Sequence, residues 1–335
     1  MTSSVGVIAN PAAGRDIRRL VAQGRVVSDQ EKANILRRVF AGLAALGVER
    51  VFVMPERVGL ARMAAEDVAG KVDVTYPEMS PEWDSGDSTV ATRRMVEAGV
   101  DCLVTLGGDG TNRVVAKACG DVPIVAISTG TNNVFPQLVE GTIAGLAAGA
   151  VATGLAPIDA VCKRSKRLDI LVDGALEDIA LVDAAVSTEI FTGARAIWDL
   201  ATVREVYLTR ASPASIGISS IGAQLRPTGM DEPVGLYIRI GGPSSADRVL
   251  APVGPGMVRE VPIAEWSVLE SGERRRVPAG AGTVALDGER EVSLLPDRKV
   301  EVELNRRGPL VVQIESAMAT LAGRAIPVTP TRATR

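Results

Sequence analysis

The sequence predicts an α/β protein in which an N-terminal parallel-sheet α/β domain is followed by a C-terminal β-sandwich domain. Short apolar runs alternate with stretches of helical periodicity as far as residue 152, which is the pattern of a parallel sheet with right-handed crossovers. After Pro157 the pattern changes to short β-rich runs separated by glycine, proline and aspartate, which is typical of an antiparallel sandwich. With 335 residues, 46% of them hydrophobic, the chain can bury two cores. We therefore expect one domain over residues 1–156 and a second over 157–308.

The composition excludes several kinds of chemistry. The chain contains no histidine, which rules out Ser-His-Asp and Cys-His nucleophilic schemes, histidine metal sites and histidine general bases. Its three cysteines occur at spacings that fit neither a disulfide framework nor a zinc site. The formal net charge of −3 argues against a nucleic-acid-binding protein that works through bulk charge. Any proton transfer must therefore use Asp, Glu, Lys, Tyr or Cys.

No targeting or membrane segment is expected. The first residues lack a basic start, and the apolar run 5–9 is too short for the core of a secretory signal. The longest weakly apolar run, residues 142–158, falls short of the roughly 20 residues that span a membrane. We predict a cytoplasmic protein with no membrane partner and no nucleic-acid partner.

The first domain is expected to alternate strands with helices. Strands are predicted over residues 5–9, 50–54, 72–76, 102–106 and 123–127. Helices are predicted between Ser28 and Gly47, over residues 60–69, up to residue 98, after residue 112, and over 142–152. Ser28 and Glu31 have the spacing of a capping box, and Asp87 or Ser88 can cap the helix that ends at residue 98.

The centre of the first domain is the string Gly107-Gly108-Asp109-Gly110-Thr111-Asn112, directly after the strand 102–106. In an open parallel sheet, ligands bind at the carboxyl ends of the strands, and glycines there let the backbone approach a ligand closely. Thr111 or Asn112 can cap the next helix, whose N-terminal partial positive charge favours a phosphate and keeps Asp109 ionised. An ionised Asp109 can accept a proton from an alcohol. The alternative is a tight turn in which Asp109 only caps the helix.

Two further polar loops follow strands of the same sheet. Asn10-Pro11-Ala12-Ala13-Gly14 follows the first strand and is either a ligand contact or a simple Pro-Gly turn. Arg15, Arg18 and Arg19 come next, as a solvated face or as a rim for phosphates. Ser128-Thr129-Gly130-Thr131-Asn132-Asn133 follows the strand 123–127, and its hydroxyls and amides suit ribose and phosphate better than an apolar ligand. Loops after neighbouring strands are expected to form the walls of one crevice.

The second domain is expected from its short β-rich runs. Strands are predicted over residues 168–172, 179–186, 216–221, 234–240, 283–286, 292–295 and 300–304, with a helical insertion around 194–200. The basic run 163–167 at the crossover is interpreted as a solvated turn. A strand over 310–314 and a helix over 315–322 precede a frayed tail.

The string Gly107-Gly108-Asp109-Gly110-Thr111 resembles the signature of the superfamily that joins NAD kinases with diacylglycerol and sphingosine kinases. In that superfamily the glycines bind nucleotide phosphates, and the aspartate lies at the phosphoryl-transfer centre. The turn at Asn10 is similar to the Asn-Pro-x-x-Gly turn of the lipid kinases, and residues 128–133 resemble their Pro-x-Gly-Thr-Gly-Asn stretch. Residues 128–136 look still closer to AcoX-type proteins, an ATP-NAD-kinase-like branch named for acetoin catabolism. The resemblance covers nearly the whole chain and implies that residues 309–323 return to the first domain.

The resemblance also implies roles for individual residues. It assigns nucleotide contacts to Asn10, Gly107, Gly108, Gly110, Thr111, Asn112, Thr129, Gly130, Thr131, Asn132 and Asn133. Asp183 occupies the position that contacts substrate ribose hydroxyls in NAD kinases, although Val182 replaces their asparagine. Asp287-Gly288-Glu289 has the form of a hairpin turn and also resembles the Asp-Gly-Glu of the lipid kinases. Asp287 is therefore a substrate-binding candidate, and Glu289 is a candidate base beside Asp109.

The function that follows from the resemblance is an ATP-dependent kinase that phosphorylates a hydroxyl of a small soluble acceptor. Mg²⁺ would arrive with ATP, without a metal site built from the protein alone. NAD is the first acceptor, as in NADP biosynthesis, because aromatics are only 3% of the chain and the net charge is −3, which argue against docking on a bilayer. A diacylglycerol-type lipid kinase and a nucleotide-binding regulatory protein without turnover stay open, as do polyphosphate as the donor and a homodimer. A dinucleotide-dependent oxidoreductase ranks last, because the first βα turn lacks G-x-G-x-x-G.

Overall fold

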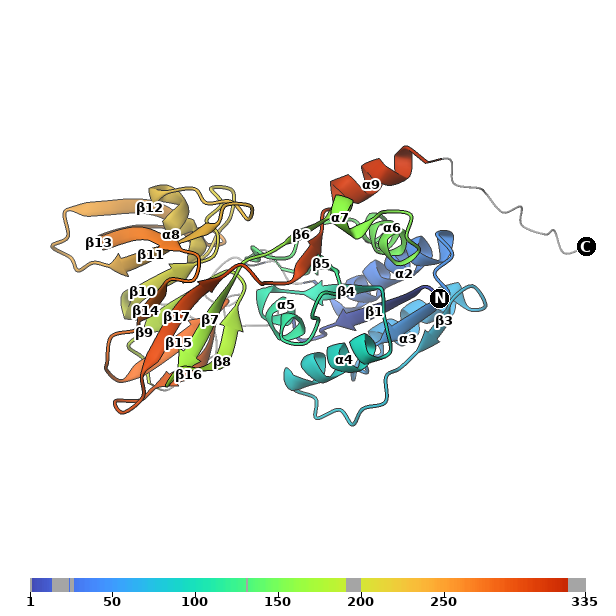
Figure 1. Ribbon diagram of the computed structural model, residues 1–335, viewed down its shortest axis with the longest axis horizontal. Helices are drawn as coiled ribbons and strands as arrows, with labels where there is room; N and C mark the ends of the chain where they lie inside the picture. The colour runs from blue at the N-terminus through green and yellow to red at the C-terminus, as the bar shows by residue number, and fades with distance from the viewer. Residues whose placement is uncertain (1, 14–23, 25–26, 131, 191–199, 325–335) are drawn as a thin grey trace, which may run out of the picture.

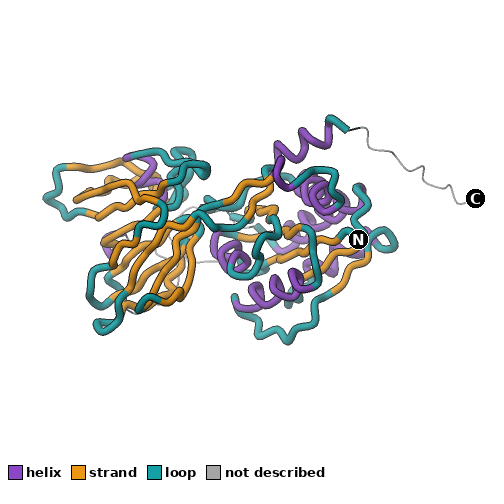
Figure 2. The backbone as a smooth tube through the Cα atoms, viewed as in Figure 1, coloured by secondary structure: helices purple, strands orange, loops and turns teal. Residues whose placement is uncertain are grey.

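The computed structural model describes residues 2–324 except for 14–23, 25–26, 131 and 191–199. Two parts lie side by side, a sheet surrounded by helices and a second part made mostly of strands (Figures 1 and 2). The second part is inserted between β6 (Cys162–Arg164) and β18 (Leu310–Val312), which pair with each other in the first sheet. The expected α/β class with a C-terminal β-sandwich is confirmed.

The sheet of the first part has seven strands in the order β3-β2-β1-β4-β5-β18-β6. Six of them run parallel: β18 and the five strands β1 (Ser4–Ala9), β2 (Arg50–Val53), β3 (Asp73–Thr75), β4 (Cys102–Gly107) and β5 (Ile124–Ser128). Every residue of β1, β4 and β5 is buried, as expected for central strands covered on both faces. The strand order reverses between β1 and β4, so the loops after these two strands border a crevice where α/β sheets bind ligands.

Helices cover both faces of this sheet. One face carries α2 (Asp29–Ala45), α3 (Leu60–Ala65), α6 (Gly141–Ala152) and α9 (Ile314–Ala322), and the other carries α4 (Gly86–Glu97) and α5 (Asp109–Ala116). The alternation along β1 follows from the pleat of the strand: Val5 and Val7 belong to the first core and Ile8 to the second. The short elements η1 (Glu66–Val68) and α7 (Ile158–Val161) complete this part.

The start of α2 agrees with the sequence, whereas the start of α4 does not. The amide of Glu31 donates to Oγ of Ser28 at 3.1 Å, so the predicted start of the helix, with Ser28 as its cap residue, is confirmed. Helix α4 begins at Gly86, so Asp87 and Ser88 lie in its first turn and neither is the cap residue. The cause is a tighter turn ahead of the helix, in which the Asp87 carboxylate accepts backbone amides.

The prediction that Thr111 or Asn112 caps α5 is also wrong. The cap residue is Gly108, in an extended conformation, and both predicted residues lie inside the helix. Asn112 joins the helix to the strand before it, because its Oδ1 accepts from Thr105 Oγ1 at 2.7 Å and its Nδ2 donates to the Gly108 carbonyl at 2.9 Å. The buried Asn112 side chain therefore holds the turn between β4 and α5 in place through two hydrogen bonds.

The second part consists of two antiparallel sheets with strand orders β12-β13-β11-β10-β9-β15-β16 and β14-β17-β7-β8. Their bounds are β7 (Arg167–Val172), β8 (Ala175–Ala180), β9 (Asp183–Ser187), β10 (Val203–Leu208), β11 (Val234–Ile240), β12 (Asp247–Gly254), β13 (Met257–Glu270), β14 (Arg274–Arg276), β15 (Gly282–Leu286), β16 (Glu289–Leu294) and β17 (Val300–Asn305). Ile170 and Val302 of the smaller sheet share one core with Val186 and Leu286 of the larger sheet. The two sheets therefore form a sandwich.

Several sequence predictions for the second part are wrong. The run 179–186 belongs to two strands, β8 and β9, because the chain bends at residues 181–182. The run 216–221 is not a strand: α8 (Ser219–Leu225) begins inside it, and Ile221 packs into the core under the larger sheet. No strand was expected where β10, β12, β13 and β14 occur. The helical insertion falls mostly on residues 191–199, outside the described residues, and is followed by η2 (Leu200–Thr202).

The C-terminal segment returns to the first part, as expected. In β18, Val311 pairs with Ile124 of β5 in parallel and with Lys163 of β6 in antiparallel register. Helix α9 then packs Ala317 and Leu321 into the first core. Among the described residues no helix has the length and apolar character needed to cross a membrane.

Candidate functional site

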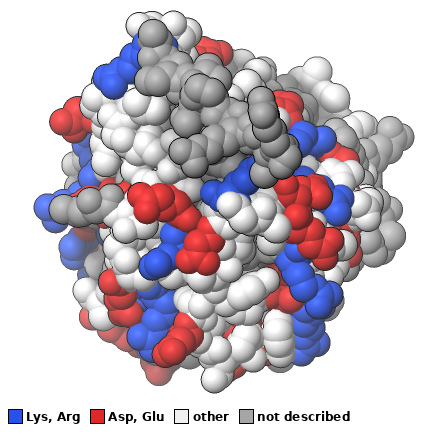
Figure 3. Space-filling model, turned by 90° about the vertical axis from the view of Figure 1, so that its right-hand side faces the viewer, with Lys and Arg blue, Asp and Glu red and all other residues white. Residues whose placement is uncertain are grey.

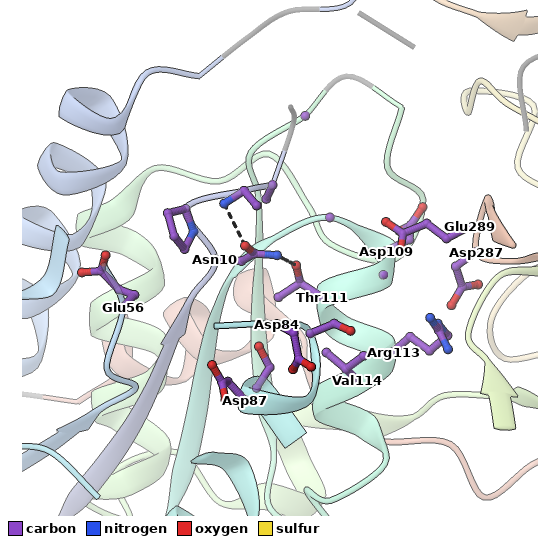
Figure 4. Close-up of a pocket in the computed structure, with 18 of the residues that line it drawn as sticks. Asn10, Glu56, Asp84, Asp87, Asp109, Thr111, Arg113, Val114, Asp287 and Glu289 are labelled. Carbon is purple, nitrogen blue, oxygen red and sulfur yellow. Dashed lines mark hydrogen bonds between the residues drawn. The ribbon is translucent and has the colours of Figure 1, made fainter. Parts of the chain in front are cut away.

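A pocket of about 530 Å³ opens at the carboxyl ends of the central strands (Figure 4). It is bordered by the turn after β1, the glycine turn after β4, the loop after β5, and the loops before α3 and α4. The second part contributes Pro255 from the β12–β13 turn, and Asp287 and Glu289 from the β15–β16 turn. The site therefore lies between the two parts of the chain, at the edge where parallel sheets bind ligands.

The glycine turn is packed so closely that residue 107 has no room for a side chain. A Cβ there would lie 2.5–2.7 Å from the side-chain atoms of Thr111. A Cβ on Gly108 would approach Oδ1 of Asn133 to 2.9 Å, and one on Gly110 would approach Oε1 of Glu289 to 3.3 Å. The turn delivers the first amides of α5 to the pocket, where the helix contributes a partial positive charge. Such an arrangement suits an anion.

The turn after β1 is held against the glycine turn by hydrogen bonds. Nδ2 of Asn10 donates to Oγ1 of Thr111 at 3.0 Å, while Oδ1 of Asn10 accepts from the amide of Ala12 at 2.9 Å (Figure 4). From α2, the fully buried ammonium of Lys32 donates to the carbonyls of Pro11 at 2.6 Å and Ala13 at 3.0 Å. The buried positive charge of Lys32 thus lies directly beneath this wall of the pocket.

Asp109 is almost buried at the start of α5 and is oriented by backbone amides. Its Oδ1 accepts from the amide of Phe135 at 2.7 Å, and both oxygens accept from the amide of Val134 at 3.1 Å. These amides belong to the segment after the 128–133 loop. Charge-assisted bonds of this kind favour the ionised carboxylate and hold it in one orientation.

The loop after β5 folds back onto the glycine turn. Nδ2 of Asn133 donates to Oγ of Ser128 at 2.8 Å, and the Asn133 side chain lies between Gly108 and Gly130. Asn132 lies beside Gly217 of the second part, which has a φ of +101°. Backbone and side-chain polar groups of both loops therefore face one space, as the sequence predicted.

Asp287 occupies the β15–β16 turn in a left-handed conformation, with φ of +52°. Its carboxylate accepts from the amides of Leu181, Val182 and Asp183 at 2.7–3.2 Å. Burial and the nearby charge of Asp109 raise the pKa of Asp287 to about 7, against the opposing effect of Arg113 and of two of these amides. Two carboxylates from different parts of the chain therefore lie on the same side of the pocket, where the charge of one affects the other (Figure 4).

Two arginines, Arg113 and Arg210, balance these carboxylates. Arg113 is buried on α5 and pairs with Asp178 at 2.9 Å, and Lys117 pairs with the same carboxylate at 2.7 Å. Arg210, which follows β10, donates to Oγ of Ser165 at 2.6 Å and stacks its guanidinium over the Phe135 ring at 5.2 Å. Burial lowers the pKa of Arg210, whereas the charges of Asp109 and Asp287 raise it. Arg210 therefore lies within the electrostatic field of both carboxylates.

The structure brings most of the expected site residues together. The pocket is lined by Asn10, Gly108, Asp109, Gly110, Thr111, Gly130, Asn132, Asn133, Asp287 and Glu289. Gly107, Asn112, Thr129 and Asp183 are buried and do not line it. Asp183 lies behind Asp287, with which it shares two backbone hydrogen bonds: its amide donates to the Asp287 carboxylate, and its carbonyl accepts from the Asp287 amide. Thr131, Arg15, Arg18 and Arg19 lie outside the described residues.

Several lining residues were not expected from the sequence. They come from the loops after β2 and β3 and from the first turn of α4, and include Met54, Glu56, Arg57, Trp83, Asp84 and Asp87. The rule that selected the loops after β1 and β4 also applies to β2 and β3, because all four strands are parallel. Strand order, which the sequence did not provide, was needed to see that these loops reach the same pocket.

The carboxylates of the described pocket suit a Mg²⁺ ion that arrives with a ligand bringing oxygens of its own. Within the described ranges no group of three or more metal-ligating side chains is found. Mg²⁺ is commonly held by one or two carboxylates plus substrate phosphates, and Asp109 and Glu289 offer carboxylates beside the glycine turn. The donor set therefore fits a cation bound to phosphate.

Comparison with known proteins places similarity over both parts. Residues 5–154 match the ATP-NAD kinase N-terminal domain family, and residues 166–307 match the acetoin catabolism protein X C-terminal domain family. A protein from Cupriavidus necator named acetoin catabolism protein X is 43% identical over 326 residues, which cover 94% of this chain and 91% of that protein.

Proposed function

This chain belongs to the acetoin catabolism protein X family, and we propose that it is an ATP-dependent kinase that phosphorylates a hydroxyl of a small water-soluble acceptor, with NAD as the first candidate. The observation that carries the proposal is the pocket itself, where a glycine turn at a helix start faces carboxylates from the second part. Phosphoryl transfer requires positioned phosphates and an oriented hydroxyl, with little covalent chemistry from the protein. The glycine turn would position the phosphates and the carboxylates would orient the hydroxyl, so neither requirement calls for histidine.

The phosphates of the donor would lie against the glycine turn. The first amides of α5 and the polar groups of Asn10, Thr111 and Asn133 surround this space. Backbone amides at a helix start favour an anion, and no Cβ on residues 108 or 110 obstructs its approach. Mg²⁺ bound with the donor would neutralise phosphate charge there.

Glu289 is the better of the two candidate bases. The acceptor oxygen attacks the terminal phosphorus, the bond from phosphorus to ADP breaks, and the hydroxyl proton needs an acceptor. Glu289 is only half-buried and its carboxylate stands over Gly110 at the helix start. Both oxygens of Asp109 already accept amide hydrogens, so we assign Asp109 to electrostatics and positioning.

Asp287 is the side chain placed to contact the acceptor from the second part, since it lines the pocket and Asp183 does not. Any contribution of Asp183 to ribose binding would act through its backbone bonds to Asp287. A water-soluble acceptor is supported by the low aromatic content of 3% and the net charge of −3. On the one face drawn in Figure 3, acidic and basic side chains are interspersed. Basic patches are the usual means of docking on an anionic bilayer.

A regulatory protein that binds a nucleotide without turnover is the second candidate. The replacement of the NAD-kinase asparagine by Val182 favours it, because valine offers no polar contact to a dinucleotide acceptor. This candidate predicts tight ATP binding and no product.

An assay of ADP release tests the proposal. Purified protein with MgATP is supplied in turn with NAD, NADH, diacylglycerol in mixed micelles, and small polyols. We expect acceptor-dependent ADP release that is fastest with NAD, together with an acceptor product heavier by one phosphoryl group. If diacylglycerol alone is phosphorylated, the acceptor is a lipid and not NAD. If ATP binds and no product forms, the regulatory protein is favoured.

A further inference from the structure

Trp83 has a backbone conformation that bulky residues rarely adopt. Its φ is +67°, in the left-handed region, where steric strain is expected for an aromatic side chain. The strain is held by Asp87, whose Oδ2 accepts from the Trp83 amide at 2.7 Å and whose Oδ1 accepts from the Glu82 amide at 2.9 Å. Strained residues that neighbouring groups hold in place are concentrated at ligand sites. Asp87 is itself buried, so the turn is a built feature of the pocket wall.

Trp83 borders the pocket and is not part of the core. The residue is 45% exposed, an unusual exposure for so large an apolar side chain, and it lines the pocket. The guanidinium of Arg57 lies 4.9 Å from the ring centroid. A ring with a cation stacked on one face can still stack a planar ligand on its other face.

The pocket lining changes in character from one side to the other. Beside Asp109 and Glu289 it consists of glycines, amides, hydroxyls and charged groups. On the side of Trp83 the lining combines apolar residues (Met54, Pro55, Val58) with charged ones (Glu56, Arg57, Asp84). In Figure 4, Glu56 and Asp87 lie on the side opposite Asp109 and Glu289, with Asn10 and Thr111 between them. A ligand that fills the pocket therefore has an anionic end at the glycine turn and a planar end with both apolar and polar atoms near Trp83.

We propose that Trp83 is the stacking residue for the purine base of the donor nucleotide, whose phosphates occupy the glycine turn. The inference rests on the proposed function, because it assumes a phosphate-bearing donor in this pocket. It deepens that function by selecting a nucleoside triphosphate over polyphosphate, which has no base to stack. Asp87 is the positioning residue that holds the Trp83 turn.

Two ligands separate base stacking from phosphate binding: MgATP and magnesium tripolyphosphate. Isothermal titration without acceptor should show that Trp83→Leu weakens MgATP binding roughly 5- to 150-fold, the range expected for losing one base–aromatic stack. Tripolyphosphate affinity should stay within about twofold of wild type, since the glycine turn is untouched. Trp83→Phe should retain most of the ATP affinity, and Trp266→Leu, on β13 and 42% exposed, is the matched control.

Two more readouts exclude a merely structural role. In a Trp198→Phe, Trp266→Phe background, Trp83 is the remaining tryptophan, and its fluorescence should change with MgATP but not with tripolyphosphate. Trp83→Gly should keep or raise the melting temperature, because glycine accepts the positive φ, while losing ATP affinity as Trp83→Leu does.

The possible failures can be told apart. A Trp83→Leu protein that binds MgATP as tightly as wild type, or that loses ATP and tripolyphosphate equally, overturns the inference alone. Wild-type protein that binds neither ligand overturns both the inference and the proposed function. If binding depends on the base but no phosphorylated product forms, the inference about Trp83 stands and only the proposed kinase turnover is contradicted.

Discussion

At the scale of single residues, the site is a set of carboxylates held in different ways. Asp109 and Asp287 are buried and oriented by backbone amides, whereas Glu289 is half-buried on the rim. Arg210 and Arg113 keep these charges in balance from two separate elements. Substitutions of the carboxylates should therefore differ in what they damage.

Asp109→Asn is expected to lower both turnover and stability. The amide group of asparagine would place an N–H donor against the amide of Val134 or Phe135, and bonds to a charged group are worth about 1.5–3 kcal/mol each.

Glu289→Gln should lower turnover roughly 100-fold or more without a change in melting temperature, because it removes the proton acceptor only. Rates of ADP release and thermal melts of both variants check this. If Asp109→Asn keeps the wild-type melting temperature and Glu289→Gln keeps the wild-type rate, the assignment of roles is reversed.

Asp287 makes the stability of the protein dependent on pH. Its pKa is raised from 3.8 to about 7, so between these values the folded protein binds more protons than the unfolded chain, and stability falls as pH rises. Asp287→Asn removes this loss. Wild type should therefore lose about 2–3 kcal/mol of unfolding free energy between pH 5 and pH 8 that Asp287→Asn does not lose. The variant's free energy of unfolding minus that of wild type rises by this amount over the same range.

Urea melts at several pH values measure this difference for Asp287→Asn. Asp121→Asn is the control, since the Asp121 side chain is 86% exposed and its replacement should give a pH-independent difference. A constant difference for both variants would show that Asp287 is ionised throughout this range.

At the scale of elements, the contact between α2 and α6 depends on glycine. A Cβ on Gly145 would lie 2.2 Å from the backbone oxygen of Val39, a contact that only helix separation can relieve. Gly149, in the same helix, has Leu46 side-chain atoms at 3.3 Å as its nearest neighbours. The two glycines are therefore a matched pair in one helix.

Gly145→Ala should destabilise the protein by about 1–3 kcal/mol or more, as overpacking does. Gly149→Ala should change stability by less than about 1 kcal/mol, because the higher helix propensity of alanine offsets a small side-chain shift. Chemical denaturation gives both values. Equal effects of the two substitutions would mean that α2 and α6 are not in close contact.

The first part was predictable element by element because its signals are local. Apolar runs and helical spacing located β1, α2, β4 and β5, and the capping box located the start of α2. The starts of α4 and α5 were misplaced because Asp87 and Asn112 bond to backbone groups outside the positions that a cap would use.

The second part was less predictable because its strands depend on distant partners. The 14-residue β13 carries many charged residues on a half-exposed sheet, so it lacks a continuous apolar run. The run 216–221 looks apolar because Ile221 is a core residue, but its backbone is helical.

The site residues that belong to sequence motifs were predicted, and those that reach the pocket only through the strand order were missed. The glycine turn, the 128–133 loop and Glu289 follow from short strings in the sequence, and all three reach the pocket. Trp83 and Arg57 belong to no motif. They reach the pocket because β2 pairs with β1 and β3 pairs with β2 in the same parallel sheet.

At the scale of the whole molecule, the first sheet is built from two distant stretches of the chain. A fragment ending at residue 155 lacks β6, β18 and α9, which leaves the edge of β5 unpaired and the first core short of Ala317 and Leu321. We expect this fragment to unfold at lower denaturant concentration and less cooperatively than the full protein. Joining residues 309–324 to residue 165 through a short Gly-Ser linker should restore a sharp transition, as followed by circular dichroism. A fragment with the full protein's stability would mean that the returning segment contributes nothing.

The insertion of the second part between β6 and β18 also sets an order of events during synthesis. Strand β5 ends at Ser128 and its partner β18 begins at Leu310, so the edge of β5 leaves the ribosome long before β18 does. At translation rates of about 5–20 residues per second, the delay is on the order of 10–40 s. An unpaired buried strand edge is a template for wrong pairing, and this one must be shielded throughout that time. The nascent chain should therefore depend on holding chaperones until its last strand is in place.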